Sequence, residues 1–263
     1  MKQESSKLQQ EVISLKNVWA GYGNNNVIED VNLSVKKTDF VAIIGPNGGG
    51  KTTLLKVILG LISPQRGEVK IMGFPPKDGR KFIGWVPQET VMDRNFPISV
   101  LEVVLMGRIQ RENMMRSYTK EDREKALQAL DMVKLSNVAN KPIGEISLGQ
   151  RQRVYIARAL AKEPQILLLD EPLASVDPST STVIYELLKE LNKTITILMV
   201  THDIGAISSY VKSVGCLNKK LYYYEDKVLT QEMIDASYHC PVDLIAHGIP
   251  HRVLPKRDRE VKS

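Results

Sequence analysis

A glycine-rich segment at residues 45–53, which reads GPNGGGKTT, constrains the fold of this chain more than any other feature. It fits the pattern G-x-x-x-x-G-K-[ST] and stands between a β-branched run at residues 40–44 and a helical pattern at residues 52–59. A buried strand, a glycine loop and a helix in that order favour an α/β core with an anion site at the helix N-terminus.

The residue types of the loop indicate a nucleotide as its ligand. Its four glycines allow backbone conformations closed to other residues, so that several N–H groups can point at one anion. The Lys51 ammonium would reach the β- and γ-phosphates, and the Thr52 hydroxyl suits Mg²⁺, which prefers oxygen ligands. We therefore expect the whole loop to bind nucleotide: Gly45, Pro46, Asn47, Gly48, Gly49, Gly50, Lys51, Thr52 and Thr53.

Two carboxylates follow a second apolar run, in the segment ILLLDEP at residues 166–172. Strands of α/β sheets place ligands at their C-terminal ends, where Asp170 and Glu171 would emerge. Asp170 would hold Mg²⁺ through water, and Glu171 would orient or deprotonate an attacking water. Solvated carboxylates at a strand end are the structural alternative, and the phosphate loop in the same chain favours catalysis over it.

The periodicity divides the chain into an α/β part, a helical part and a second α/β part. Strands are expected at 12–18, 31–35, 68–72, 82–86, 166–169, 195–200, 213–217 and 220–224, with a glycine–asparagine turn at 21–26. Helices are expected at 99–106, 119–133, 151–161, 178–191 and 204–210, the second of them burying Ala126, Leu127, Leu130 and Val133. The predicted units are 1–94, 95–162, 163–235 and a tail at 236–263.

A third motif, ISLGQRQR at residues 146–153, begins a predicted helix. Alone, it is typical of a helix capped by Ser147. Here it comes about twenty residues before the Asp-Glu pair and about a hundred after the phosphate loop. This combination resembles the ATP-binding subunit of ABC transporters over nearly the whole chain. The resemblance implies a P-loop NTPase (RecA-like) core with an antiparallel β edge and an inserted all-α signature subdomain.

The resemblance also assigns roles to single residues. Tyr22 would stack on adenine, and Gln88 would join the core to the helical subdomain and sense Mg²⁺ beside Thr52 and Asp170. Ser147, Gly149 and Gln150 belong to the signature, and Asp177 to a loop after the carboxylate pair. His202 would contact the γ-phosphate, so that Glu171, His202 and Lys51 are the expected catalytic residues.

Partners and location follow from the same resemblance. The family forms a homodimer in which the phosphate loop of one copy and the signature of the other clamp ATP. Integral-membrane permease subunits would bind directly and an extracytoplasmic solute-binding protein indirectly, at the cytoplasmic face of the membrane, where the chain would be peripheral. Leu148 departs from the family because a glycine is usual there; its bulk puts the efficiency of hydrolysis in question.

The segments at 95–108 and 240–254 resemble the zinc, manganese and iron importers of the family. Neither identifies the metal. Uptake of a transition metal is the expected function. The alternatives are a motor for a non-metal transporter, or a non-transport ATPase of this superfamily that acts on nucleic acid. A nucleic-acid ATPase of this superfamily would carry a long coiled coil between its ATPase halves, whereas no sustained heptad pattern lies between the two α/β parts of this chain.

The net charge of +6 would favour a nucleic-acid partner, but its distribution along the chain weakens that interpretation. Half of it lies in residues 252–263, which hold five basic and two acidic residues, so the rest of the chain is nearly neutral. This end is expected to be a solvated tail, with phospholipid head groups or an acidic partner as the alternative. His239, Cys240, His247 and His251 gather nearby, but their spacing fits no compact zinc site, so we expect a structural or surface role rather than a metal sensor.

Overall fold

The computed structural model of the protein describes residues 10–23, 25–88, 96–109, 117–174, 176–202 and 210–224. Most of the predicted helix at 204–210 and the whole predicted tail, with its three histidines and Cys240, lie outside these residues. Among the described residues, no helix has the length and apolar character needed to cross a membrane.

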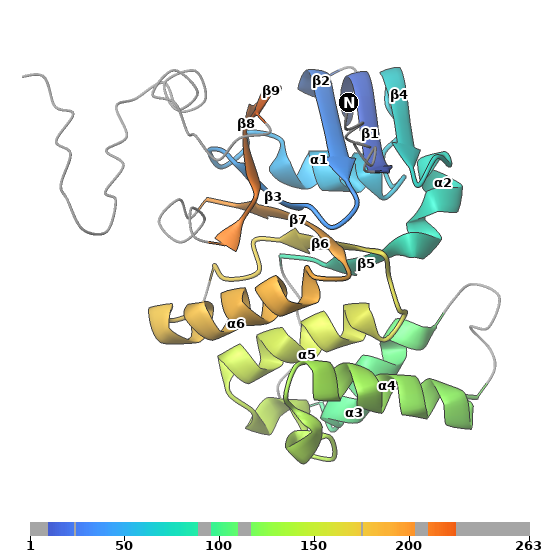
Figure 1. The fold of residues 1–263 in the computed structure, drawn as a ribbon, viewed down its shortest axis with the longest axis vertical. Coiled ribbons are helices and arrows are strands. Elements are labelled where there is room, and N and C mark those ends of the chain that lie inside the picture. Colours follow the sequence, from blue (N-terminus) through green and yellow to red (C-terminus); the bar gives the residue numbers. More distant parts are fainter. Residues whose placement is uncertain are drawn as a thin grey trace, which may run out of the picture.

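A six-stranded sheet forms the centre of the molecule, with the order β5-β6-β7-β3-β8-β9 (Figure 1). Its strands are β3 Phe40–Ile44, β5 Ile83–Val86, β6 Ile166–Asp170, β7 Thr196–Thr201, β8 Ser213–Asn218 and β9 Lys220–Tyr224. The first five strands in that order pair in parallel and β9 is antiparallel to β8. β3 is buried throughout because both faces of the sheet are covered, as its continuous apolar run predicted.

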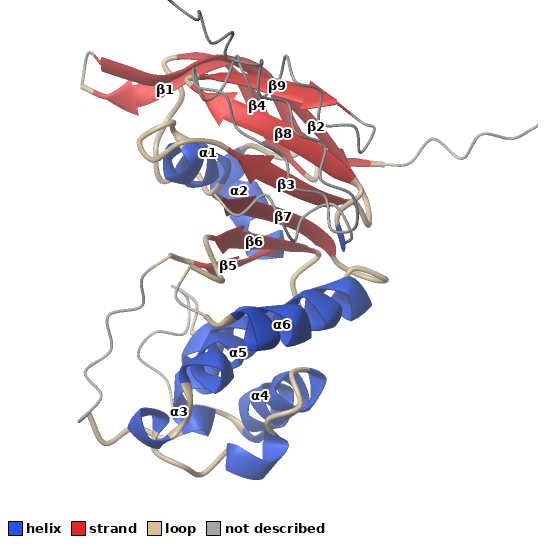
Figure 2. Cartoon of the chain, turned by 90° about the vertical axis from the view of Figure 1, so that its left-hand side faces the viewer, coloured by secondary structure: helices blue, strands red, loops and turns tan. Residues whose placement is uncertain are grey.

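A second, antiparallel sheet lies above the first, with the order β2-β1-β4 (Figure 2). Its strands are β1 Glu11–Tyr22, β2 Asn25–Lys36 and β4 Arg66–Ile71. Helix α1, Lys51–Ile58, packs between the two sheets and buries Leu54, Leu55 and Ile58 there. The predicted turn at 21–26 is shorter than expected, because most of its residues continue the β1–β2 pairing.

The helices cover the opposite face of the large sheet. They are α3 Val100–Leu105, α4 Lys120–Met132, α5 Leu148–Leu160 and α6 Pro178–Leu191. α6 packs on the sheet, and α3, α4 and α5 pack on one another below it (Figures 1 and 2). The predicted caps of the first two helices are confirmed, since Ser99 and Thr119 each form a reciprocal capping box.

Several short elements were not predicted. They are a one-turn helix, α2 Pro76–Gly79, and 3-10 turns at Arg80–Phe82, Met106–Arg108, Ser136–Val138 and Ile143–Glu145. The predicted buried face of α4 was wrong at Leu127, which is 40% exposed. The buried positions of α4 are Asp122, Ala126, Ala129 and Leu130, a stripe at helical spacing that bypasses Leu127. The charge of the buried Asp122 is compensated by Arg108 at 3.0 Å.

Candidate nucleotide-binding site

The phosphate loop connects the end of β3 to the start of α1. Gly50, the residue before the helix, has φ of 100° and therefore uses backbone freedom that other residues lack. A Cβ on Gly45 would overlap the carbonyl oxygen of Leu217 in β8. No side chain caps the N-terminus of α1, so its first N–H groups and the positive end of its dipole are available to an anion.

Lys51 begins this helix and is only 6% exposed. Its ammonium donates to the carbonyl oxygens of Gly45 at 2.9 Å and Pro46 at 3.1 Å. It also lies 3.4 Å from Oε1 of Glu171. These contacts hold the charge of Lys51 inside the loop, at the place where an anion would meet the helix N-terminus.

Asp170 ends β6 and is 1% exposed. Burial raises the pKa of its carboxyl, and the Thr52 hydroxyl, which donates to it at 3.3 Å, opposes that rise. A hydroxyl and a carboxylate placed side by side, with the negative charge poorly solvated, are a donor set that fits a hard divalent cation. The residues present therefore fit Mg²⁺.

Glu171 is the residue on which three predicted site residues converge. Its Oε2 accepts a hydrogen bond from Nε2 of Gln88 at 3.2 Å and lies 3.0 Å from Nδ1 of His202. Its φ of 45° is in the left-handed region, which is strained for a glutamate, and its N–H donates to the carbonyl of Val200 at 2.9 Å. The strand end thus holds the carboxylate over the loop, as sequence reasoning predicted.

Lys51, Glu171 and His202 line one cavity of about 560 Å³, whereas Asp170 is not part of its lining. Its lining combines loop residues, the first turn of α1 and the Gln88–Glu171–His202 group. Val27 also lines it and was not predicted, because an ordinary apolar side chain carries no motif. Ala174, the first residue of the loop that ends at Asp177, lines the cavity as well. The cavity therefore offers backbone donors, one ammonium, an oxygen-rich corner and a carboxylate that can act as a base.

Tyr22 does not line this cavity in the described part of the chain. It ends β1 and is 54% exposed, with its hydroxyl 3.3 Å from Nζ of Lys56 on α1. The tyrosine therefore lies on an open surface beside the helix that follows the phosphate loop.

The signature residues also lie away from the cavity lining, at the N-terminus of α5. The Ser147 hydroxyl accepts from the N–H of Gln150 at 3.2 Å, and the Gln150 side chain accepts from the N–H of Ser147 at 3.0 Å. A Cβ on Gly149 would overlap the Thr180 side chain of α6, so this glycine allows the two helices to meet closely. Leu148 is 44% exposed beside it.

Asp177 caps the neighbouring helix α6. The Thr180 N–H at 3.0 Å and the Ser179 hydroxyl at 2.5 Å both donate to its carboxylate, which holds the pKa of that group well below its usual range. The N-termini of α5 and α6 are thus neighbours on one surface, separate from the phosphate loop of the same chain.

Known proteins are similar to this chain in sequence and fold. Residues 28–174 match the ABC transporter family. A "Probable metal transport system ATP-binding protein" of Chlamydia pneumoniae is 47% identical, covering 76% of this chain and 83% of that protein. The zinc uptake system ATP-binding protein of Listeria innocua is 38% identical, covering 81% of this chain and 85% of that protein. The manganese transport system ATP-binding protein of Bacillus subtilis is 39% identical, covering 86% of this chain and 92% of that protein.

Solved structures agree with the fold. The ADP conformation of an ABC transporter cassette matches with a TM-score of 0.75 at 28% identity, covering 88% of this chain and 96% of that one. A dimeric bacterial ABC transporter cassette matches with a TM-score of 0.68 at 33% identity, covering 83% and 100%. The predicted RecA-like core with its antiparallel edge and helical insertion is confirmed.

Proposed function

This chain belongs to the ABC transporter family, and on that premise we propose that it binds and hydrolyses ATP to power the uptake of a transition-metal ion. Relatives named for zinc and for manganese transport support a metal but leave zinc, manganese and iron open. The observation that carries the proposal is the convergence of Lys51, Gln88 and His202 on Glu171, beside the phosphate loop.

In the proposed mechanism, the loop N–H groups and Lys51 bind the phosphates, and Tyr22 stacks on adenine. Glu171 accepts a proton from water as the water attacks the γ-phosphate in line, and His202 supports Glu171 and contacts that phosphate. Positioning and charge stabilisation supply most of the rate enhancement in reactions of this class. The units 1–94, 95–162, 163–235 and 236–263 remain a proposed division of the chain.

Mg²⁺ would be held by Thr52, Gln88 and Asp170, and when bound it would neutralise phosphate charge. Asp170→Asn is expected to abolish the tightening of ATP binding by Mg²⁺. Because burial raises the pKa of Asp170, its ionised form destabilises the fold at neutral pH. The same variant should therefore raise the melting temperature, by roughly 2–4 °C for each kcal/mol gained in the free energy of unfolding. Calorimetry with and without Mg²⁺ measures both effects.

The matched control is Asp131→Asn, which changes an exposed carboxylate at the end of α4. It should alter neither Mg²⁺ dependence nor melting temperature appreciably. Mg²⁺-dependent ATP binding that survives in Asp170→Asn would remove Asp170 from the metal site.

We propose that two copies join so that Ser147 and Gly149 of one complete the ATP site of the other. Gln150 and Asp177 would hold this surface in shape through their helix caps. The dimeric relative and the exposure of the α5 N-terminus support this arrangement.

Leu148→Gly is expected to raise the ATPase rate about 2–10-fold, because it removes bulk where the partner's phosphate would approach. Glycine in place of leucine at the first helical position of α5 should lower the free energy of unfolding by less than about 1 kcal/mol. Leu148→Ala separates side-chain bulk from backbone freedom. A steady-state rate that is unchanged in both variants would show that the leucine is neutral.

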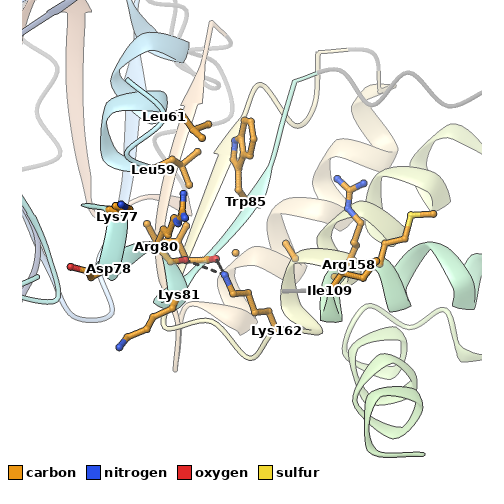
Figure 3. A pocket seen from close by; sticks show the side chains of 15 residues that line it. Leu59, Leu61, Lys77, Asp78, Arg80, Lys81, Trp85, Ile109, Arg158 and Lys162 are labelled. Atoms are coloured by element: carbon orange, nitrogen blue, oxygen red, sulfur yellow. Dashed lines mark hydrogen bonds between the residues drawn. The ribbon is translucent and has the colours of Figure 1, made fainter. Parts of the chain in front are cut away.

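A basic groove between the core and the helical part supports binding to a membrane partner (Figure 3). Its volume is about 750 Å³, with Leu61 and Trp85 on the core side and Ile109 and Arg158 on the helical side. Five cations and one acid line it: Lys77, Arg80, Lys81, Arg158, Lys162 and Asp78. We propose that its occupant is a short segment of a permease subunit with apolar and acidic side chains.

The double substitution Lys77→Glu with Lys81→Glu is expected to reduce co-purification with the permease at least about tenfold. The introduced glutamates would then face the acidic side chains of the permease segment and repel them. Both lysines are exposed, and ATP hydrolysis by the isolated chain should not change. Lys120→Glu with Lys193→Glu is the control for net charge, away from the groove. Equal permease recovery in the two double variants would contradict this docking site.

Metal uptake by cells tests the function as a whole. A strain that lacks this chain should lose zinc, manganese or iron accumulation, and wild-type chain but not Glu171→Gln should restore it. Permease subunits should co-purify from native membranes, placing the chain at their cytoplasmic face, with a solute-binding protein recovered only through them. Salt-sensitive DNA binding without a membrane partner would favour the nucleic-acid alternative.

A further inference from the structure

The turn between β8 and β9 lies against the phosphate loop although about 170 residues separate them. The backbone N–H of Lys219 donates to the carbonyl oxygen of Gly49 at 3.1 Å. The carbonyl oxygen of Lys219 accepts from the N–H of Glu29 in β2 at 2.8 Å. Leu217, in β8, places its carbonyl oxygen 2.9 Å from where a Cβ on Gly49 would stand. One turn is therefore bonded to both the loop and the antiparallel sheet.

The bond to Gly49 orients a donor of the nucleotide site. The carbonyl of Gly49 and the N–H of Gly50 belong to one trans peptide unit, so they point in opposite directions. Gly50 lines the cavity, and because neither Gly49 nor Gly50 carries a Cβ, the peptide between them can rotate at little steric cost. Holding the Gly49 oxygen toward β8 therefore aims the Gly50 N–H toward the opposite side, where phosphate would bind.

We propose that Lys219 is a positioning residue for nucleotide binding, which acts through its backbone N–H on the Gly49–Gly50 peptide. Its side chain is exposed and is not required. Its φ of 58° lies in the left-handed region, so glycine or asparagine can replace it without loss of the bond.

The test compares four variants by calorimetric titration of the full chain with ADP, which is not hydrolysed. Lys219→Pro removes the N–H and cannot adopt the observed φ, so the Kd for ADP should rise about tenfold or more. Lys219→Val keeps the N–H but strains the turn, and a smaller rise in Kd is expected. Lys219→Gly and Lys219→Asn should bind ADP like the wild-type chain.

Lys134 offers a matched control. It is also an exposed lysine with left-handed φ, 57°, and its N–H donates to the carbonyl of Asp131 at 2.8 Å, in the helical part of the chain. Lys134→Pro and Lys134→Val should lower the melting temperature as the Lys219 variants do, yet leave the Kd for ADP unchanged.

These measurements separate positioning from general destabilisation. An ADP Kd that stays at the wild-type value in folded Lys219→Pro, or that rises equally in Lys134→Pro, would overturn the proposal. If Lys219→Pro does not fold, the Kd for ADP of Lys219→Val is compared with that of Lys134→Val. A rise in Lys219→Val alone supports the proposal, and an equal Kd in the two variants overturns it. Failure of the wild-type chain itself to bind ADP would instead overturn the proposed nucleotide site along with this role of Lys219.

Discussion

Glu171→Gln is expected to reduce the ATPase rate by about 10²–10⁴-fold while ATP binding is retained. The carboxylate is the general base of the proposed mechanism, and an amide of nearly the same shape cannot accept the proton. Gln88 and His202 can still hydrogen-bond the new side chain, so the cavity should keep its form. Because ATP then persists, closed dimers should accumulate, which size-exclusion chromatography with ATP would detect.

Glu68→Gln is the control for this substitution. Glu68 is an exposed glutamate of β4 that pairs with Lys70 at 2.8 Å, so the variant loses an ion pair but no catalytic group. It should hydrolyse ATP at the wild-type rate, and its oligomeric state in the presence of ATP should be that of the wild-type chain. Wild-type turnover in Glu171→Gln would remove Glu171 from its role as base.

Lys51→Met is expected to weaken ATP binding about 10–100-fold and to reduce hydrolysis below detection. Charged hydrogen bonds are worth about 1.5–3 kcal/mol, and the ammonium is held within the loop by Gly45 and Pro46 where phosphate would bind. Methionine keeps the length and apolar stem of the side chain. Titration calorimetry with ATP measures the loss directly.

A change in fold is distinguished from a change in binding by Lys193→Met. Lys193 follows α6, is exposed and pairs with Glu190 near the end of that helix. It does not line the cavity at the phosphate loop. Both variants should give similar circular dichroism, but only Lys51→Met should lose ATP affinity. Equal ATP affinity in the two would mean that Lys51 does not bind phosphate.

Local patterns predicted much of the fold because they concern residues that are adjacent in sequence. The run at Phe40–Ile44 is a buried parallel strand, and the caps at Ser99 and Thr119 formed as their residue types indicated. Gln88 and His202 came from the family resemblance, since a lone glutamine and a lone histidine carry no such pattern of their own.

Two features escaped prediction for physical reasons. Leu127 was placed inside from the helical spacing of apolar residues, whereas the buried stripe of α4 includes a charged residue, Asp122, that is paired with Arg108. Hydrophobic spacing does not register a buried charge. The contact of Lys219 with Gly49 joins backbone atoms from distant parts of the chain, and backbone atoms are the same in every residue. Side-chain patterns therefore hold no information about it.

In the proposed dimer, the separation of Lys51 from Ser147 within one chain determines how ATPase activity depends on protein concentration. Lys51 lines the cavity, whereas Ser147 lies at the N-terminus of α5, outside the cavity lining. In the proposed dimer, one copy can bind ATP but two copies must meet to hydrolyse it. At dilutions below the dimer dissociation constant, the reaction velocity would therefore increase with the square of chain concentration. Doubling the protein in such an assay would quadruple the velocity.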